Sequence, residues 1–372
     1  MLQNPLKLTE KGPHADVAAC QIEAVHEDVL VGMLDALAAH GLSSHSMLNA
    51  RIASQRGDFF EVVPPRKGTV EYLDCDGLEG WEALERRMRS VKPRLVFFNT
   101  FQRRGQAELM LRLGKPAWGV VHNPTLFASF PECLRVAEKG QIEAFVLAPH
   151  VAEALEKTVP ALKGHIHVHH PIGWAAQGAD TWSLPDEGAP LEIAIPGTVD
   201  YKGRAWEEML EHLSATQTVA SRPVRFVIVA GGPDRADFFA RVEALGLSDL
   251  FDFEPLDPET RRVPHRALME RLYRAHAIMP MLPPNRMDFL TSKISTAMPA
   301  CVGTARPTLL PAHIAEIYGM PAIEVPRERP FDLRKADLSD ATLTAARAAV
   351  VARRAEMEQE NIDTIRPLLE RI

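Results

Sequence analysis

The sequence has few cysteines, and they are widely separated. Its four cysteines, Cys20, Cys75, Cys133 and Cys301, lie far apart in the 372 residues and show no C-x-x-C spacing. This spacing argues against a zinc site or a disulfide framework, and it is typical of reduced thiols in a cytosolic protein. We therefore expect a cytoplasmic protein.

Long apolar runs and an excess of positive charge are also missing. No stretch approaches the ~20 apolar residues of a membrane helix, and residues 1–14 have no apolar core of signal-peptide length. We expect no transmembrane segment, and peripheral contact with a membrane stays open. The 42 Lys and Arg residues against 49 Asp and Glu residues give a net charge of −7. This balance argues against a general nucleic-acid binder but leaves room for a local basic pocket.

Apolar runs of strand length alternate with longer helical patterns along the chain. Residues 95–98 (LVFF) form a short apolar run that ends at Asn99, and residues 224–230 form another that ends at a glycine pair. Each run is followed by a helical pattern, and this alternation predicts α/β domains with largely parallel sheets. In such sheets, ligands bind beyond the carboxyl ends of the strands. Helical patterns cover residues 29–40, 79–91, 105–113 and 151–157, and a further strand is predicted at 278–282.

A chain of this length exceeds what one core usually supports, so we expect two domains. Residues 177–190 are rich in Gly, Pro and acidic residues, which is typical of a linker. A long helical pattern over 340–360 can extend past Pro367. The predicted units are a first domain, a second domain and a C-terminal helix, at residues 1–176, 191–339 and 340–372.

The loop after the first strand of the second domain, IPGTVDYKGR, contains Lys202 and Gly203. A lysine at the carboxyl end of a strand can reach a diphosphate, and a glycine lets backbone N–H groups approach it. Taken alone, the loop favours a solvated lysine in a turn, because it is not a P-loop.

Two further segments of the second domain are candidates for anion binding. Gly231 and Gly232 follow an apolar strand, where glycines mark either a tight turn or a place where a ligand meets the backbone. Residues 291–297 (TSKISTA) are predicted to start a helix, with Thr291 and Ser292 as caps and Lys293 in the first turn. Helix N-termini bind anions, although ordinary capping needs no ligand.

The first domain offers two candidate positions. His122 stands at the end of a predicted strand, where a histidine can donate to a substrate hydroxyl or act as a base. A lone histidine is more often structural. Glu23, His26 and Glu27 precede the first helix and could contact an acceptor, or could form an acidic cluster that complements the helix dipole.

Together these motifs resemble the donor-binding domain of GT-B glycosyltransferases, most of all the large retaining family that uses nucleotide sugars (glycosyltransferase group 1). The family's Lys-Gly loop, its G-x-G-P-like turn and its segment with two acids all have counterparts in order along the chain. The matching residues are Lys202 and Gly203, Gly231 and Gly232 in AGGPD, Tyr273 and Ala275, and Asp288 with Thr296, Ala297 and Met298.

The resemblance implies an α/β protein with two Rossmann-like domains that face each other across a cleft, and a C-terminal helix that crosses back to the first domain. It implies transfer of a sugar from a nucleotide-diphosphate sugar to a glycan, lipid-linked or protein acceptor. No D-x-D motif is present, and GT-B enzymes usually need no metal, so we expect neither a metal nor a cofactor. The implied catalytic residues are Lys202, His122 and Asp288. The implied donor-binding residues are Gly197, Thr198, Gly203, Arg204, Gly231, Gly232, Thr291, Ser292, Lys293 and Thr296, and the acceptor would contact Glu23, His26 and Glu27.

Two positions depart from the family pattern. Thr198 replaces the family's arginine before the Lys-Gly loop, and Thr296 replaces its second acid. Arg204 and Lys293 are the candidates to supply the missing positive charge. Two alternatives therefore stay open: a non-catalytic GT-B-like protein that binds a glycan or a partner, and a nucleotide-sugar epimerase or phosphorylase on the same architecture.

Overall fold

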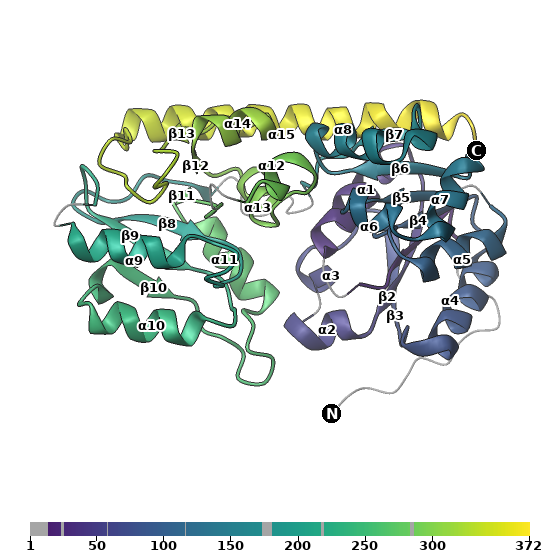
Figure 1. The fold of residues 1–372 in the computed structure, drawn as a ribbon, viewed down its shortest axis with the longest axis horizontal. Coiled ribbons are helices and arrows are strands. Elements are labelled where there is room, and N and C mark those ends of the chain that lie inside the picture. Colours follow the sequence, from purple (N-terminus) through teal and green to yellow (C-terminus); the bar gives the residue numbers. More distant parts are fainter. Residues whose placement is uncertain are drawn as a thin grey trace.

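The computed structural model describes residues 14–23, 26–57, 59–115, 117–172, 181–216, 219–282 and 286–372. It contains two α/β lobes, with one long helix running along both of them (Figure 1). No helix within these ranges combines the length and the apolar character that crossing a membrane requires.

The first lobe is built on a seven-stranded sheet with the order β3-β2-β1-β4-β5-β6-β7, in which every neighbouring pair is parallel. Strands that are covered on both faces form continuous apolar runs, as in the fully buried β4, which has the predicted bounds. The strands are β1 Val17–Gln21, β2 Ser44–Asn49, β3 Gly68–Leu73, β4 Leu95–Phe98, β5 Ala117–Val120, β6 Ile142–Val146 and β7 Ile166–Val168.

Helices cover both faces of this sheet (Figure 1). The four predicted helices are present with bounds within two residues, as α1, α4, α5 and α8. Four others were not predicted, although Pro124 and Pro131 open α6 and α7 at a position that suits proline. The helices are α1 Glu27–Ala39, α2 Arg51–Arg56, α3 Phe59–Val62, α4 Gly77–Val91, α5 Arg104–Leu113, α6 Pro124–Ala128, α7 Pro131–Glu138 and α8 Pro149–Thr158.

The second lobe has a four-stranded parallel sheet with the order β10-β9-β8-β11. A parallel bridge between Ile278 and Thr308 joins the small β12–β13 pair to its edge. The strands are β8 Leu191–Ile195, β9 Val224–Ile228, β10 Phe251–Phe253, β11 Ala277–Ile278, β12 Leu309–Leu310 and β13 Ile323–Glu324. The helices are α9 Trp206–Ala215, α10 Arg235–Ala244, α11 His265–Arg274, α12 Asp288–Thr291, α13 Ala297–Gly303, α14 Ala312–Tyr318 and α15 Asp340–Leu369.

Strand β11 is shorter than the predicted strand at 278–282. The Met279 N–H still donates to the Ala194 carbonyl at 2.9 Å, but Pro280 has no N–H for a further hydrogen bond. The chain therefore leaves the sheet here.

In each sheet the strand order reverses beside the first strand, between β1 and β4 in the first lobe and between β8 and β11 in the second. The predicted linker at 177–190 falls between β7 and β8, with residues 177–180 outside the described ranges. The residue boundaries of the predicted domains stay predictions.

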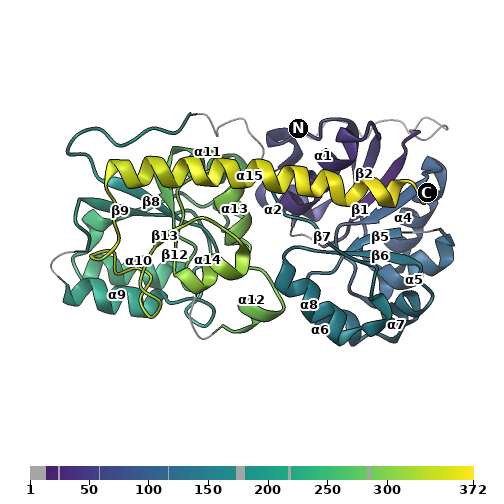
Figure 2. The same cartoon turned by 90° about the horizontal axis from the view of Figure 1, so that it is seen from above.

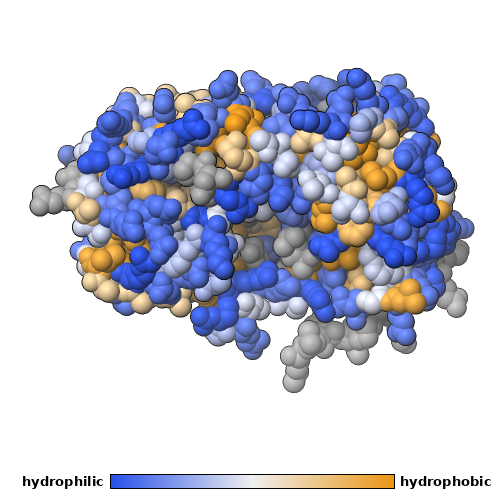
Figure 3. Space-filling model, viewed as in Figure 1, coloured by the Kyte–Doolittle hydropathy of each residue, from blue (hydrophilic) through white to orange (hydrophobic). Residues whose placement is uncertain are grey.

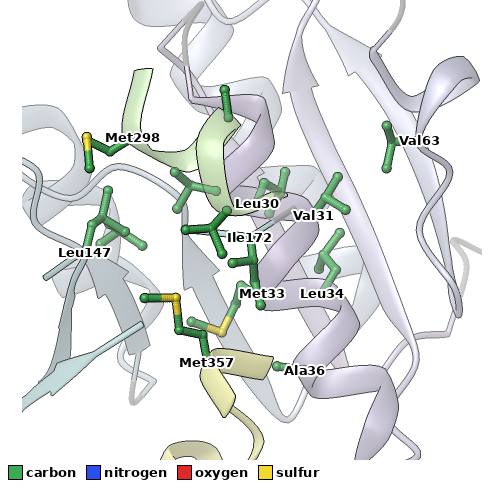
Figure 4. Close-up of a cluster of buried hydrophobic side chains, with 14 of the residues drawn as sticks. Leu30, Val31, Met33, Leu34, Ala36, Val63, Leu147, Ile172, Met298 and Met357 are labelled. Atoms are coloured by element: carbon green, nitrogen blue, oxygen red, sulfur yellow. The ribbon is translucent and has the colours of Figure 1, made fainter. Parts of the chain in front are cut away.

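Helix α15 begins at Asp340 and crosses both lobes, so that its end lies on the first lobe (Figures 1 and 2). It packs against α1 and α13. One apolar core runs through this junction, where Leu30 and Met33 of α1, Met298 of α13 and Met357 of α15 come together (Figure 4). The predicted C-terminal helix that crosses back to the first domain is confirmed.

Candidate functional site

The carboxyl ends of the two sheets face each other. Glu27, after β1, has its Oε1 3.9 Å from Nε2 of His265, which follows β10. His150, after β6, has its Nε2 2.9 Å from the carbonyl oxygen of Lys293, beyond β11. The molecular surface is hollowed between the lobes (Figure 3). Open α/β sheets bind ligands at carboxyl ends where the strand order reverses, so a ligand is expected at the β8/β11 and β1/β4 junctions.

Arg204 lies at the β8/β11 junction and is only 8% exposed. Its Nη1 donates to the carbonyl oxygen of Met281 at 3.0 Å, and its Nη2 donates to Oγ of Ser295 at 3.4 Å. Gly197, with φ 106°, lies against the guanidinium, and a β-carbon at that position would collide with it. The positive φ and the close approach of the guanidinium both favour glycine at this position.

The charge of Arg204 is compensated only in part, by the nearby carboxylate of Asp200. Among the residues that the structure describes, no acid forms an ion pair with it. Burial, together with nearby Arg286, lowers the pKa of Arg204 from 12.5 to about 10, so the side chain stays charged at neutral pH. A guanidinium has five N–H groups, and two are used here. The remaining donors and the charge are chemically suited to an anion.

The rest of the Lys-Gly loop is held by Asp200. Its Oδ1 accepts from the backbone N–H of Lys202 at 2.9 Å. The side chain of Lys202 is exposed. A β-carbon on Gly203 would lie 3.6 Å from Nη1 of Arg286, so this second arginine borders the loop. Arg286 was missed in the sequence, where its only signal is an arginine two positions before Asp288 and after a predicted strand.

Asp288 is ion-paired. Its two carboxylate oxygens each accept from Arg286 at 2.9 Å, and Nζ of Lys293 lies 3.4 Å from Oδ2. The hydrogen bond from Arg286 lowers the pKa of Asp288 to about 2. The predicted first acid is thus a fixed, ionised carboxylate beside the Lys-Gly loop.

The predicted helix start at 291–297 is wrong. The Asp288 carbonyl accepts from the N–H groups of both Ser292 and Lys293, at 3.0 and 2.8 Å, which closes the short helix α12. Thr291 and Ser292 therefore end a helix, and α13 begins only after Thr296, which is exposed and makes no side-chain cap. The amide groups of 291–293 are consequently not those of a helix N-terminus.

The glycine pair brings two loops into backbone contact. The Val199 N–H donates to the Gly231 carbonyl at 2.9 Å, and a β-carbon on Gly232 would collide with the backbone of Val199. Likewise, a β-carbon on Gly231 would crowd the carbonyl of Arg261. Gly232 is therefore needed for packing of the loop that carries Lys202, whereas Gly231 allows the close approach of Arg261. Thr198, in the loop that carries Lys202, is exposed.

His122 and His26 stack at the β1/β4 junction of the first lobe, with ring centroids 4.0 Å apart. His122 Nε2 lies 2.9 Å from the Asn99 carbonyl, which can only accept, so Nε2 carries the proton and Nδ1 is an acceptor. Asn99 also donates to the His26 carbonyl at 2.8 Å. Burial lowers the pKa of His26 to about 4 and that of His122 well below 6.5. Both rings are neutral at pH 7, and His122 presents a hydrogen-bond acceptor.

The three predicted acceptor residues lie in different settings. Glu23 is paired with Arg103 at 2.9 Å and is partly exposed. His26 has the left-handed φ of 77° and precedes α1. Glu27 is buried next to His265 in the contact between the lobes. Of the described residues, no group of three or more His, Cys, Asp and Glu side chains is arranged to hold a metal ion.

No protein-family model and no curated protein sequence matches the chain. Solved structures do. HepE from Anabaena, in a complex with UDP and glucose, aligns over 96% of this chain and 100% of its own, with 10% identity and a TM-score of 0.61. A glycosyltransferase from Rickettsia africae aligns over 97% and 99%, with 11% identity and a TM-score of 0.60.

The chain has the GT-B fold. WaaG, a glycosyltransferase involved in lipopolysaccharide biosynthesis, is also similar over 93% of this chain and 98% of its own, with 12% identity and a TM-score of 0.57. The predicted fold class is confirmed. In GT-B terms, the β8/β11 junction with Arg204 belongs to the second Rossmann-like domain, and the stacked histidines belong to the first.

Proposed function

We propose that the chain is a glycosyltransferase that moves a sugar from a nucleotide-diphosphate sugar to a glycan, lipid-linked or protein acceptor. The observation that carries the proposal is Arg204: a buried guanidinium without an ion-pairing acid among the described residues, at the β8/β11 junction of a GT-B fold. A buried charge of this kind is costly unless something compensates it. A diphosphate would do so.

The cations around the Lys-Gly loop would stabilise the leaving group. As the glycosidic bond breaks, negative charge collects on the diphosphate, and fixed donors aimed at that charge lower the barrier. Arg204 is held rigidly by Met281 and Ser295, while exposed Lys202 is free to reach the outer phosphate. Arg286 borders the same loop, and its guanidinium is paired with Asp288. The complex of HepE with UDP and glucose supports this choice of donor class.

The sugar would be held from both lobes. The Asp288 carboxylate, ionised and oriented by Arg286, can accept hydrogen bonds from sugar hydroxyls. From the first lobe, neutral His122 can accept one through Nδ1. The acceptor molecule would enter near Glu23 and His26. Since cationic side chains neutralise the diphosphate in this scheme, we propose that transfer needs neither a metal ion nor a cofactor.

Nucleotide binding tests the donor site. We expect calorimetry to detect binding of UDP or GDP to the wild-type protein. Binding of neither at millimolar concentration would favour a GT-B-like protein that binds a glycan or a partner instead. Product analysis with a labelled sugar should show transfer to an acceptor rather than epimerisation of the donor. The rate of transfer should be the same with and without EDTA.

The Lys202→Ala variant tests the leaving-group role. We expect transfer to slow by about 100-fold, the typical cost of removing one transition-state donor. Lys335→Ala, which removes another exposed lysine of the second lobe, is the matched control and should transfer at the wild-type rate. A Lys202→Ala variant as fast as wild type would contradict the assignment.

A further inference from the structure

Segment 289–295, which comprises the last residues of the short helix α12 and the chain up to Ser295, is fixed by two side chains from outside it. One is Tyr318, at the end of α14 in the second lobe, and the other is His150, at the start of α8 in the first lobe. The segment directly follows Asp288 and ends at Ser295, which contacts Arg204, so its position affects both.

Tyr318 ties the two ends of the segment together. Its hydroxyl donates to the Phe289 carbonyl at 2.7 Å and accepts from the Ser295 N–H at 3.3 Å. The residue is 7% exposed, and a phenolic group buried to this degree usually needs such partners. Both hydrogen bonds stay within the second lobe, so Tyr318 sets the shape of the segment.

His150 links the segment to the other lobe. Its Nε2 lies 2.9 Å from the Lys293 carbonyl, which can only accept, so Nε2 is the donor. The imidazole also meets the Tyr318 ring edge-on, with centroids 5.1 Å apart. One histidine thus contacts both the segment and the tyrosine that shapes it, from across the boundary between the lobes.

The segment connects this contact to the anion site. Oγ of Ser295 accepts from Nη2 of Arg204 at 3.4 Å, and Nζ of Lys293 lies 3.4 Å from Oδ2 of Asp288. A shift of the segment would therefore move a partner of Arg204 and a partner of Asp288 together.

We propose that His150, acting with Tyr318, is a positioning residue that makes the donor site complete only when the two lobes are docked at this contact. The proposal rests on the proposed function, since it assigns His150 a role in donor binding. The first lobe would then contribute to donor affinity without touching the diphosphate.

His40 provides a matched control for His150. It is also a half-buried histidine of the first lobe, and its Nε2 lies 2.8 Å from a backbone carbonyl, that of Ile362 in α15. Its hydrogen bond likewise joins distant parts of the chain, but it has no contact with segment 289–295.

The experiment compares His150→Ala, His150→Gln and His40→Ala in the full chain. By calorimetry with UDP or GDP, whichever the wild type binds, His150→Ala should raise Kd at least about fivefold, within the usual range of coupling between sites. His150→Gln keeps an N–H donor at similar reach and should restore the wild-type Kd. His40→Ala should lower Tm without changing Kd. Equal Kd values for His150→Ala and wild type would overturn the proposal, as would equal increases in both alanine variants.

A second measurement does not depend on any ligand. Amide hydrogen exchange of the free protein should be faster over 289–295 in His150→Ala and in Tyr318→Phe than in wild type, and unchanged there in His40→Ala. Unchanged exchange in His150→Ala would overturn the positioning role. If the wild type binds neither nucleotide, the proposed function fails, and the exchange result still decides whether His150 positions the segment.

Discussion

Arg204 carries a charge that its surroundings disfavour in the absence of ligand. The fall of its pKa from 12.5 to about 10 corresponds to about 3 kcal/mol against the charged form. Proteins keep such groups where binding needs them, at a cost in stability. Arg204 is therefore the residue at which stability and ligand binding should change in opposite directions.

The Arg204→Met variant tests whether stability and nucleotide binding change in opposite directions. Replacing an unpaired buried charge with an apolar side chain of similar length should raise the free energy of unfolding of the ligand-free protein, by about 1–3 kcal/mol. It should also weaken UDP or GDP binding by at least about tenfold, because a charge-assisted contact to phosphate is lost. Urea denaturation and calorimetry measure the two effects.

Arg306→Met is the matched control. Arg306 is buried too, and it binds the carbonyl oxygens of Tyr273 and Thr304 at the ends of two helices, away from the β8/β11 junction. That variant should lose stability and keep its nucleotide affinity. A destabilised Arg204→Met variant with normal affinity would assign Arg204 a purely structural role.

The sequence identifies some residues of the site and not others. Residues that belong to a local sequence pattern are found, whereas residues that contact each other from distant parts of the chain are not. Lys202 and Arg204 stand next to a glycine in a loop after an apolar run, a local pattern. By contrast, the hydrogen bond from His150 to Lys293 joins residues 143 positions apart, and no local pattern marks either of them. Tyr318 was missed for the same reason.

At the scale of elements, the β8–α9 loop depends on the glycine pair after β9. A β-carbon on Gly232 would meet the carbonyl oxygen and the nitrogen of Val199, which are backbone atoms and cannot rotate away. The loop that carries Lys202 would have to move.

Gly232→Ala should therefore lower the free energy of unfolding by about 2 kcal/mol or more and weaken nucleotide binding. Gly246→Ala is the matched control: Gly246 also has a positive φ, 68°, but open space around it. It should cost about 1–2 kcal/mol through backbone strain alone and leave affinity unchanged. Thermal unfolding and calorimetry separate the two variants. Unchanged affinity in Gly232→Ala would place the glycine pair outside the donor site.

Elements with strong local signals were predicted well. The run LVFF gave the bounds of β4, and the pattern over 340–360 gave the start of α15. The error at Thr291 has a physical cause: threonine and serine suit both ends of a short turn, and only the hydrogen bonds to the Asp288 carbonyl show that a helix ends there.

At the scale of the whole molecule, buried neutral histidines make stability depend on pH. Burial lowers the pKa of His169 to about 3 and that of His26 to about 4. Below pH 6.5 the unfolded chain binds protons that the folded chain does not. The free energy of unfolding should therefore decrease as the pH is lowered, until the pKa of the folded state is reached. Each such histidine contributes about 1.4 kcal/mol per pH unit within that window.

His169→Met isolates one of these contributions. Within the described part of the chain, neither ring nitrogen of His169 has a hydrogen-bond partner, so the substitution removes no hydrogen bond of the side chain. Urea denaturation should show a slope of stability against pH that is smaller by about 1.4 kcal/mol per unit between pH 5.5 and 4. At pH 8 neither histidine nor methionine at this position is charged, so a difference in the free energy of unfolding at that pH measures packing alone. If plots of the free energy of unfolding against pH were parallel for the variant and the wild type, His169 would not contribute to the pH dependence.

The long helix α15 has a consequence for how the protein is made. Asn361 accepts from the His170 N–H at 2.7 Å and donates to the His170 carbonyl at 2.9 Å, across 191 positions of sequence. A ribosome adding about 5–20 residues per second needs roughly 10–40 s to cover that distance. During that time the second lobe emerges, while α1 and the chain after β7 still lack the helix that covers them. The first lobe is thus begun first and completed last.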